Sequence, residues 1–490
     1  MYLALDLKSA DDYRKFLQIR GLPKYRFTGR CADVPDEYAH LIGASAAKDT
    51  HADYHPAGYL FDYQRDIAKI AIRKRKFAAY VDCGLGKTAI IFEFARHALR
   101  ATGKPVLIVS PSMVISQTQA EHEKFYPDDD RIVRLDSGSL ESFLRDGSGI
   151  AICSYNILAK GIDGRNLGGL ILDESSMLKS AYGKWGTACV ELGQGVPYKL
   201  ACTGTPAPND RIEFAQTAVF LDQCRTVNEF YARYFVNRGQ TDNRWEMKPH
   251  AQQRFYKDLS GWSIFLSNPA TYGWKDNSQA LPPIEIKTYD INLTEEQRKA
   301  SESLTGSMFV TNAGGITTRS KLAQLAKGKG AESLKPAFIW SLVKTFNSDG
   351  SIIWCKFNDE QDALANAIPD AANIDGSTPD AKRQELIDDF KSGRRKVLIS
   401  KPKILGFGLN LQVARHHIFS TLMDSYEEYY QCIKRSNRIG STSPLTVHIP
   451  ISELDAAGVE NVLRKAANVD ADTRIQEHLF KSQGWSYLNG

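Results

Sequence analysis

Short apolar runs alternate with amphipathic stretches along two parts of the chain, residues 59–205 and the region after residue 350. The apolar runs have the length of buried strands, and the stretches between them have helical periodicity. This alternation predicts βαβ units, parallel sheets and an α/β fold of two similar lobes. The predicted strands are 77–81, 106–110, 149–153, 170–172 and 199–203 in the first lobe and 352–355, 396–400, 417–420 and 445–449 in the second; the predicted helices include 88–99, 379–390 and 425–439.

The segments outside the two lobes have other patterns. Residues 206–350 begin helical and aromatic-rich, pass through one strand followed by a helix opening near Thr294, and then become rich in Gly and Lys. They are interpreted as helical protrusions and a hinge. A capped helix is expected at 9–17. The predicted organisation is 1–58 N-terminal accessory segment, 59–222 first lobe, 223–345 helical protrusion and interlobe linker, 346–452 second lobe and 453–490 C-terminal helical segment.

Composition narrows the class of protein. Lys and Arg (62) barely exceed Asp and Glu (57), so the net charge of +5 permits nucleic-acid binding without requiring it. No run approaches the roughly 18 apolar residues of a membrane span, and the N-terminus lacks the basic start of a signal peptide. The eight cysteines are dispersed without a CxxC pair, which favours reduced, buried thiols. A cytoplasmic protein without membrane partners is expected.

The run DCGLGKT, at residues 82–88, carries the first chemical signal. A predicted strand precedes it and a predicted helix follows it, so backbone N–H groups and a positive helix end point at an anion. Lys87 is placed to reach the β- and γ-phosphates, and the Thr88 hydroxyl to ligate magnesium. Val81 stands where the usual phosphate-loop pattern has glycine. The residues assigned to ATP binding here are Asp82, Gly84, Leu85, Gly86, Lys87 and Thr88.

A carboxylate pair, Asp173 and Glu174, directly follows a later predicted strand. Alone, such a pair is more often a solvated strand end. When the pair follows a phosphate loop, a catalytic role is favoured, because one carboxylate can hold magnesium and its neighbour can orient and deprotonate the attacking water. We therefore expect Asp173 to bind the metal, together with Thr88, and Glu174 to be the general base.

Two further short segments fit a nucleotide site. CTGTP ends the strand at 199–203, and its Thr203, Gly204 and Thr205 are expected to sense the nucleotide state. Gln64 lies upstream of the phosphate loop, where its amide can contact the adenine edge. Considered alone, Gln64 fits a surface helix residue better.

These motifs together resemble those of superfamily-two helicases, and most closely those of the Swi/Snf-type DNA translocases. The resemblance covers residues 59–450 in the family's order. The matching segments are YLFDYQ (Q motif), DCGLGKT (motif I), residues 105–125 (Ia), 152–158 (Ib), LILDESSMLKS (II), 203–221 (III), GFGLNLQ at 406–412 (V) and QCIKRSNRIG at 431–440 (VI).

The resemblance implies two tandem RecA-like lobes, ATP as substrate and Mg²⁺ as its metal ion. It assigns Arg435 and Arg438, expected three apart on one helix, to the charge that develops on the γ-phosphate. Hydrolysis would then need Lys87 and Glu174 from one lobe and these arginines from the other. The resemblance adds Gly408 and Gln431 to the ATP contacts.

Nucleic-acid contacts in this family come from loops that follow strands. The matching positions here are Ser110, Pro111, Ser154, Tyr155 and Asn410. Contacts to the backbone of the nucleic acid predict little sequence preference. The aromatic and basic stretch 230–265 is interpreted in two equally weighted ways, as a base-stacking surface or as the core of a small helical protrusion.

The leading hypothesis is an ATP- and magnesium-dependent motor that translocates on DNA. Duplex DNA is favoured over single strands, RNA is a less favoured partner, and a monomer is expected. A strand-separating DNA or RNA helicase is the alternative, followed by a nucleic-acid-binding scaffold with a weak ATPase. A P-loop kinase leaves GFGLN and QCIKRSNRIG unexplained.

Overall fold

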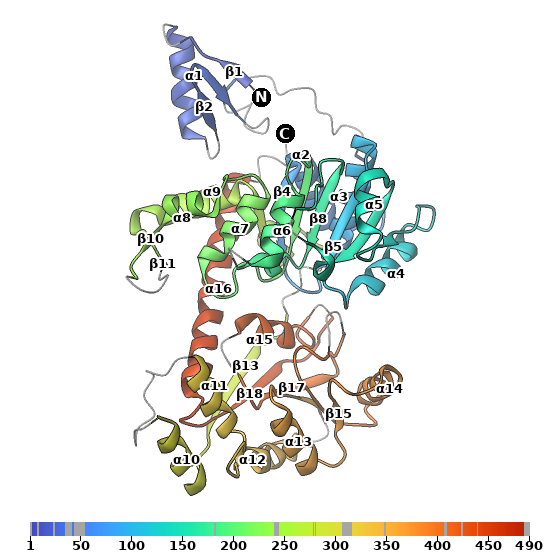
Figure 1. Ribbon diagram of the computed structural model, residues 1–490, viewed down its shortest axis with the longest axis vertical. Helices are drawn as coiled ribbons and strands as arrows, with labels where there is room; N and C mark the ends of the chain where they lie inside the picture. The colour runs from blue at the N-terminus through green and yellow to red at the C-terminus, as the bar shows by residue number, and fades with distance from the viewer. Residues whose placement is uncertain are drawn as a thin grey trace. The chain divides into compact units, whose positions relative to one another are not determined.

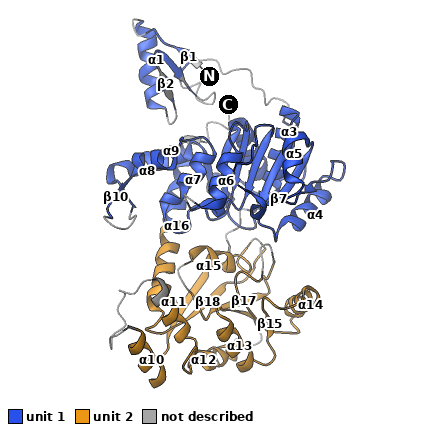
Figure 2. Cartoon of the chain, in the orientation of Figure 1, with its two compact units in different colours: residues 1–278, 471–490 blue, residues 279–470 orange. Residues whose placement is uncertain are grey.

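The computed structural model of the chain is shown in Figure 1. It forms two units, which Figure 2 distinguishes by colour: unit 1 comprises residues 1–278 and 471–490, and unit 2 comprises residues 279–470. The structure describes residues 2–6, 9–22, 25–34, 42–43, 54–159, 161–180, 183–239, 245–277, 279, 281–305, 316–346, 349–405, 409–422, 425–438 and 440–484.

Unit 1 is built on a seven-stranded parallel sheet with the strand order β12-β4-β9-β8-β5-β7-β6. Apart from the exposed edge strand β6, its strands are buried almost throughout, which explains why they are continuous apolar runs in the sequence. The strands are β4 (Lys76–Val81), β5 (Val106–Ser110), β6 (Val133–Arg134), β7 (Ile150–Ser154), β8 (Gly169–Asp173), β9 (Tyr198–Cys202) and β12 (Ser263–Leu266); the helices are α2 (Asp62–Lys74), α3 (Lys87–Thr102), α4 (Ile115–Phe125), α5 (Leu140–Asp146), α6 (Lys184–Leu192) and α7 (Phe214–Phe220).

Strand β12 was not predicted, although it pairs in parallel with β4 from Ser263–Ala78 to Leu266–Val81. The sequence SIFL that forms it is short, lies within an amphipathic aromatic stretch and has no strand periodicity of its own. Its β conformation is therefore decided by the free edge of β4, where its four residues become buried.

The aromatic and basic stretch before β12 folds as α8 (Val227–Tyr234), the hairpin β10 (Phe235–Asn237) and β11 (Trp245–Met247), and α9 (Gln252–Ser260). Its aromatic rings pack against one another, and several arginines around them are ion-paired. The structure thus favours the core interpretation over a stacking surface. The buried aromatic residues are Phe230, Tyr231, Tyr234, Phe235, Phe255, Tyr256 and Trp262.

Residues 2–34 add a small antiparallel sheet of order β1-β3-β2 with one helix. The Ser9 hydroxyl accepts a hydrogen bond from the Asp12 N–H, so the predicted helix cap is present. The strands, three residues each, were too short to be predicted from the sequence. The elements are β1 (Tyr2–Ala4), α1 (Ala10–Gly21), β2 (Arg26–Thr28) and β3 (Cys31–Asp33).

Unit 2 contains a six-stranded parallel sheet of order β13-β18-β17-β14-β16-β15. With the sheet of unit 1, it confirms the predicted α/β class of two parallel sheets with accompanying helices. The strands are β13 (Ile284–Asp290), β14 (Gly350–Trp354), β15 (Ala372–Ile374), β16 (Val397–Ser400), β17 (Ala414–Phe419) and β18 (Leu445–Ile451); the helices are α10 (Glu295–Thr305), α11 (Ile316–Leu325), α12 (Lys335–Val343), α13 (Asn358–Ala367), α14 (Asp380–Lys391), α15 (Tyr426–Ile433) and α16 (Ala456–Gly484), of which the residues from Ala471 onward belong to unit 1.

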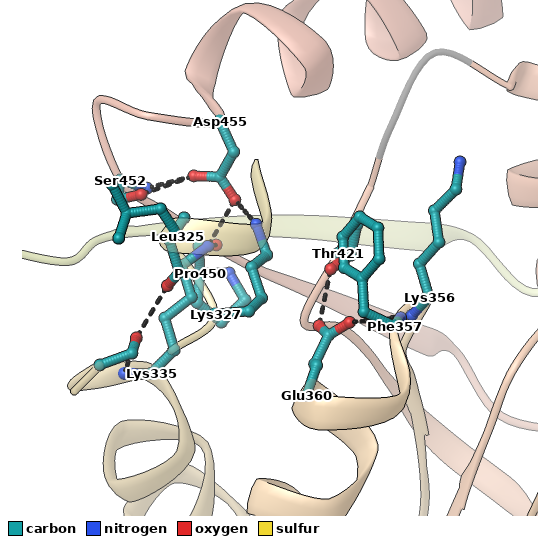
Figure 3. A network of polar contacts seen from close by, with 12 residues as sticks. Leu325, Lys327, Lys335, Lys356, Phe357, Glu360, Thr421, Pro450, Ser452 and Asp455 are labelled. Atoms are coloured by element: carbon teal, nitrogen blue, oxygen red, sulfur yellow. Dashed lines mark hydrogen bonds and ion pairs between the residues drawn. The ribbon is translucent and has the colours of Figure 1, made fainter. Parts of the chain in front are cut away.

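Two buried carboxylates form hydrogen bonds that connect separate segments of unit 2 (Figure 3). Asp455, just before α16, accepts hydrogen bonds from the ammonium groups of Lys327 and Lys335, which are also buried. Glu360 of α13 accepts the Thr421 hydroxyl at 2.6 Å and the backbone N–H groups at the start of its own helix. Each network joins elements far apart in the sequence.

Among the described helices, none is both long enough and apolar enough to cross a membrane.

Candidate nucleotide-binding site

The loop between β4 and α3 has the backbone of a phosphate-binding turn. Gly84 and Gly86 adopt left-handed φ angles of 89° and 73°, which other residues reach only with strain. Helix α3 begins directly after the loop and directs its positive end at it. The Asp82 N–H is held by the Leu266 carbonyl oxygen of β12 at 2.9 Å. The unpredicted strand therefore supports the start of this loop.

Gln64 lies directly against the phosphate loop. Its Nε2 donates to the Leu85 carbonyl oxygen at 3.1 Å, and its Oε1 accepts the Phe61 N–H at 3.1 Å. The Tyr63 hydroxyl donates to the same Leu85 oxygen at 3.1 Å. A Cβ added at Gly86 would come within 2.2 Å of Gln64 Nε2. Gln64 is therefore buried against the loop and is not the exposed helix residue that the sequence by itself favoured.

Lys87 is the first residue of α3, and its ammonium is directed back toward the strands. Nζ donates to the Val81 carbonyl oxygen at 3.1 Å and lies 3.9 Å from Glu174 Oε1. Burial by itself lowers the pKa of Lys87, but nearby groups outweigh it and raise the pKa above its usual range. Lys87 therefore carries its charge at neutral pH. The groups that raise its pKa are Cys83, Glu174, Asp173 and Asp82.

Asp173, the last residue of β8, is held by Ser110, the last residue of β5, and by Tyr155, which follows β7. The Ser110 hydroxyl donates to its Oδ2 at 2.9 Å, and the Tyr155 hydroxyl donates to its backbone oxygen at 2.8 Å. Burial raises the pKa of Asp173, although Ser110 and Lys87 oppose that shift. A carboxylate that loses solvation in this way favours a cation next to it.

Glu174 is joined to the segment predicted to sense the nucleotide. The Thr203 hydroxyl donates to Glu174 Oε2 at 3.0 Å, and the Thr205 N–H donates to Thr203 Oγ1 at 3.1 Å. Gly204 lies between the two threonines. Glu174 has a left-handed φ of 50°, an uncommon conformation for a residue with a side chain that recurs at functional sites. The TGT segment thus contacts one of the two carboxylates directly.

The segment bearing Arg435 and Arg438 differs from its prediction. Helix α15 ends at Ile433 instead of continuing to residue 439, so the two arginines do not share a helix face. The cause is tertiary. The Arg435 carbonyl accepts the Leu411 N–H, and Ser436 and Asn437 donate side-chain hydrogen bonds to other carbonyl oxygens of unit 2. Gln431 lies in the last turn of α15, and Gly408 falls outside the described residues.

The positions expected to contact nucleic acid differ in exposure. Ser110, Pro111 and Tyr155 are buried, Ser154 is half-buried, and Asn410 is exposed. Because the Ser110 and Tyr155 hydroxyls both bond to Asp173, they serve the candidate metal-binding carboxylate. Contact of these loops with nucleic acid stays a prediction. At Ser110 and Tyr155, whose hydroxyls are engaged with Asp173, such a contact would have to be made by main-chain atoms.

Sequence reasoning missed the segment that holds the start of α2. Trp274 Nε1 donates to Asp66 Oδ2 at 2.6 Å, and Asn277 Nδ2 donates to the Tyr63 hydroxyl at 3.1 Å. Asp62 Oδ2 accepts the Lys275 N–H at 2.7 Å. No local signal marks these residues, because their partners lie more than 200 positions away in the sequence.

Comparison with known proteins places these features in a family. Residues 80–345 match the SNF2-related domain, and residues 335–440 match the helicase conserved C-terminal domain. The chain is 24% identical over 463 residues to the DNA annealing helicase and endonuclease ZRANB3 of Mus musculus, covering 88% of this chain and 42% of that protein. It is 24% identical over 434 residues to the Zorya protein ZorD of Escherichia coli, covering 75% of this chain and 39% of that protein.

The chain thus spans about two fifths of the length of these two relatives. The SWI2/SNF2 ATPase core of Sulfolobus solfataricus, solved in complex with dsDNA, aligns over 87% of this chain and 97% of its own, with 21% identity and a TM-score of 0.39. The SNF2-related match alone covers more than half of the chain. The chain belongs to the SNF2-related family of ATP hydrolases.

Proposed function

We propose that the chain is an ATP- and magnesium-dependent motor that translocates on DNA, with duplex DNA as its preferred track. The observation that carries the proposal is the linkage of three motifs in unit 1 by one ion pair and one hydrogen bond. Lys87 of the phosphate loop lies beside Glu174, and Glu174 accepts the hydroxyl of Thr203. A change in charge at the phosphate loop therefore reaches the TGT segment through a single carboxylate.

In hydrolysis, we assign each of these residues a separate task. The Lys87 ammonium binds the β- and γ-phosphates, and its present partner Glu174 is released to orient and deprotonate water. Arg435 and Arg438 of unit 2 stabilise the charge that develops on the γ-phosphate. A cation in this role is worth about 10³–10⁵ in rate in other phosphate-transferring enzymes.

The residues in unit 1 fit a magnesium ion bound together with ATP. In the described part of the chain, no group of three or more His, Cys, Asp or Glu is placed to hold a metal by itself. Mg²⁺ bound to nucleotides usually has only one or two protein oxygen ligands and takes the rest from phosphates and water. Asp173 and the Thr88 hydroxyl would hold it, and the ion would neutralise phosphate charge. The half-buried Asp173, whose pKa is raised by its loss of solvation, suits such a cation.

DNA is the proposed partner because of the family and its relatives. The mouse relative is named a DNA annealing helicase. The loops at Ser154 and Asn410 are candidate contacts with the sugar-phosphate backbone, which would make binding weaken steeply with salt. A strand-separating helicase is the second candidate, favoured by the match to the helicase C-terminal domain.

The test is steady-state ATP hydrolysis without nucleic acid and then with single-stranded DNA, duplex DNA or RNA. We expect the strongest stimulation by duplex DNA. Lys87→Ala should lower turnover by about 10²–10³, the usual cost of losing one group that stabilises transition-state charge, while DNA binding is retained. Lys104→Ala, at an exposed lysine of the same unit, is the control and should be indistinguishable from the wild type.

Three results would contradict parts of this proposal. Stimulation by single strands or RNA alone would transfer the assignment to a conventional helicase. Unchanged turnover in the Lys87→Ala variant would remove the phosphate loop from the mechanism. Binding of DNA that is insensitive to salt would exclude contacts dominated by phosphates.

A further inference from the structure

His417 is a buried histidine that no motif explains. It lies in β17, between β14 and β18 of the second sheet, with an exposed fraction of 0%. Its ring contacts two polar groups: Trp354 Nε1 is 3.2 Å from Nδ1, and Ser436 Oγ is 2.8 Å from Nε2. Ser436 lies between Arg435 and Arg438, the two arginines assigned to the γ-phosphate.

The chemistry of the partners determines the protonation of this ring. The indole N–H of Trp354 can only donate, so Nδ1 of His417 must be the acceptor. A neutral imidazole then carries its proton on Nε2 and donates it to Ser436 Oγ. Burial chiefly, and the charge of Arg435 secondarily, lowers the pKa of His417 to about 3, so the ring is neutral at physiological pH. Protonation of Nδ1 would place two N–H groups face to face.

The series of hydrogen bonds extends from His417 through Ser436 to Leu411, with each donor fixed by the one before it. Having accepted from His417, the Ser436 hydroxyl donates to the Leu411 carbonyl oxygen at 2.8 Å. The Leu411 N–H in turn donates to the Arg435 carbonyl oxygen at 2.9 Å. Residues 435 and 436 are therefore clamped at two points to the strand-connecting segment at Leu411. The series of hydrogen bonds Trp354→His417→Ser436→Leu411 has one possible direction, because the tryptophan indole cannot accept a hydrogen bond.

This clamp acts on the segment that follows the end of α15 at Ile433. Beyond Ile433, local turn hydrogen bonds continue: the Lys434 N–H donates to the Tyr430 carbonyl oxygen and the Asn437 N–H donates to the Ile433 carbonyl oxygen, both at 2.9 Å. Contacts with other segments of unit 2 add to these local bonds. Gln412 Nε2 also lies 3.4 Å from the Arg438 carbonyl oxygen, and the Ser441 hydroxyl donates to the Ser436 carbonyl oxygen at 2.6 Å. The backbone from which both arginines extend is thus held in part through the Ser436 side chain, which accepts a hydrogen bond from His417 in the sheet.

We propose that His417 is a positioning residue for ATP hydrolysis: its neutral imidazole donates to Ser436 and so fixes the backbone from which Arg435 and Arg438 act. Its ring is fully buried and acts through Ser436. The inference rests on the proposed role of the two arginines. A displacement of about 1 Å in a catalytic group can cost up to 10²-fold in rate, so a single buried hydrogen bond can matter this much.

Two isosteric substitutions separate the two nitrogens of the ring. In His417→Gln, the amide NH₂ can occupy the place of Nε2 and still donate to Ser436. In His417→Asn, the amide oxygen can replace Nδ1 and accept from Trp354, but the donor to Ser436 is lost. We expect the Gln variant to retain more than half of the wild-type kcat, and the Asn variant to lose about 10- to 100-fold in kcat with little change in KM for ATP.

Ser436→Ala and Arg435→Ala complete the experiment. Ser436→Ala should reproduce the kcat of His417→Asn. The double variant with both substitutions should have a kcat no lower than that of either single variant, because both substitutions interrupt the same series of hydrogen bonds. Equal losses in the Gln and Asn variants, or losses that follow only the melting temperature, would overturn the positioning role. If Arg435→Ala has normal turnover, the proposed arginine role fails; if it is inactive while His417→Asn is normal, only the present inference fails.

Discussion

The phosphate loop of unit 1 and the arginine segment of unit 2 are assigned to the same reaction, but they are built in different ways. The loop obtains its shape from adjacent residues, with left-handed Gly84 and Gly86 followed at once by α3. The segment around Arg435 is held by Leu411 and, through Ser436, by His417 of β17. The first is a local structure that the fold supports, whereas the second combines local turns with hydrogen bonds to residues far away in the sequence.

The difference predicts where each site is vulnerable. A change within the loop itself should damage the nucleotide site. In unit 2, the shape of the arginine segment should be sensitive to substitutions far away in the sequence, because buried polar side chains there supplement the local backbone hydrogen bonds. Three further experiments test this contrast.

The largest effect is expected at Asp455. Asp455→Asn would leave the ammonium groups of Lys327 and Lys335 buried without their counter-charge, which costs about 3–5 kcal/mol in comparable pairs. Hydrogen exchange should therefore accelerate in α12 and β18 of unit 2, while the sheet of unit 1 is unaffected. Asp380→Asn, at a 95% exposed carboxylate paired with Arg383, is the control and should change stability by less than about 0.5 kcal/mol. Equal effects of the two variants would contradict the buried-pair argument.

An intermediate effect is expected at Gly86. In Gly86→Ala, the new methyl group meets Gln64 Nε2, and the left-handed backbone adds roughly 1–2 kcal/mol of strain. We expect ATP affinity to fall by about 10- to 100-fold, measured by titration with a fluorescent ATP analogue. Gly103→Ala is a matched control, since Gly103 also has a left-handed φ but nothing lies within 4 Å of an added Cβ. It should cost stability without changing ATP affinity. The comparison breaks if both variants lose affinity equally.

The smallest effect is a dependence of stability on pH. Burial lowers the pKa of His417 to about 3 and that of His448 to about 4, from 6.5 in the unfolded chain. Below pH 6.5 the unfolded state therefore binds more protons, and unit 2 loses stability as the pH falls toward 4. Each histidine contributes a slope of up to about 1.4 kcal/mol per pH unit. His417→Gln should reduce the slope measured by denaturant unfolding by up to that amount; an unchanged slope would mean that His417 is not buried in its neutral form.

Much of the fold could be predicted, because strands buried on both faces are continuous apolar runs. Each predicted strand overlaps an observed one, including Val106–Ser110, whose bounds agree. Strand β12 was missed since its four residues acquire their conformation only beside β4. The end of α15 was misplaced for a similar reason: helical periodicity continues past Ile433, but contacts with Leu411 and Pro282 compete for the backbone and side chains there.

By itself, the sequence determined the class of the fold, the family and the order of the motifs, because phosphate loops and buried strands are encoded by neighbouring residues. Only the tertiary structure decided that Ser110 and Tyr155 serve Asp173, that the aromatic residues at 230–265 form a core, and that His417 supports the arginine segment. These decisions depend on which side chain is buried next to which. Such proximity arises when distant strands pair, and no local pattern of residues records it.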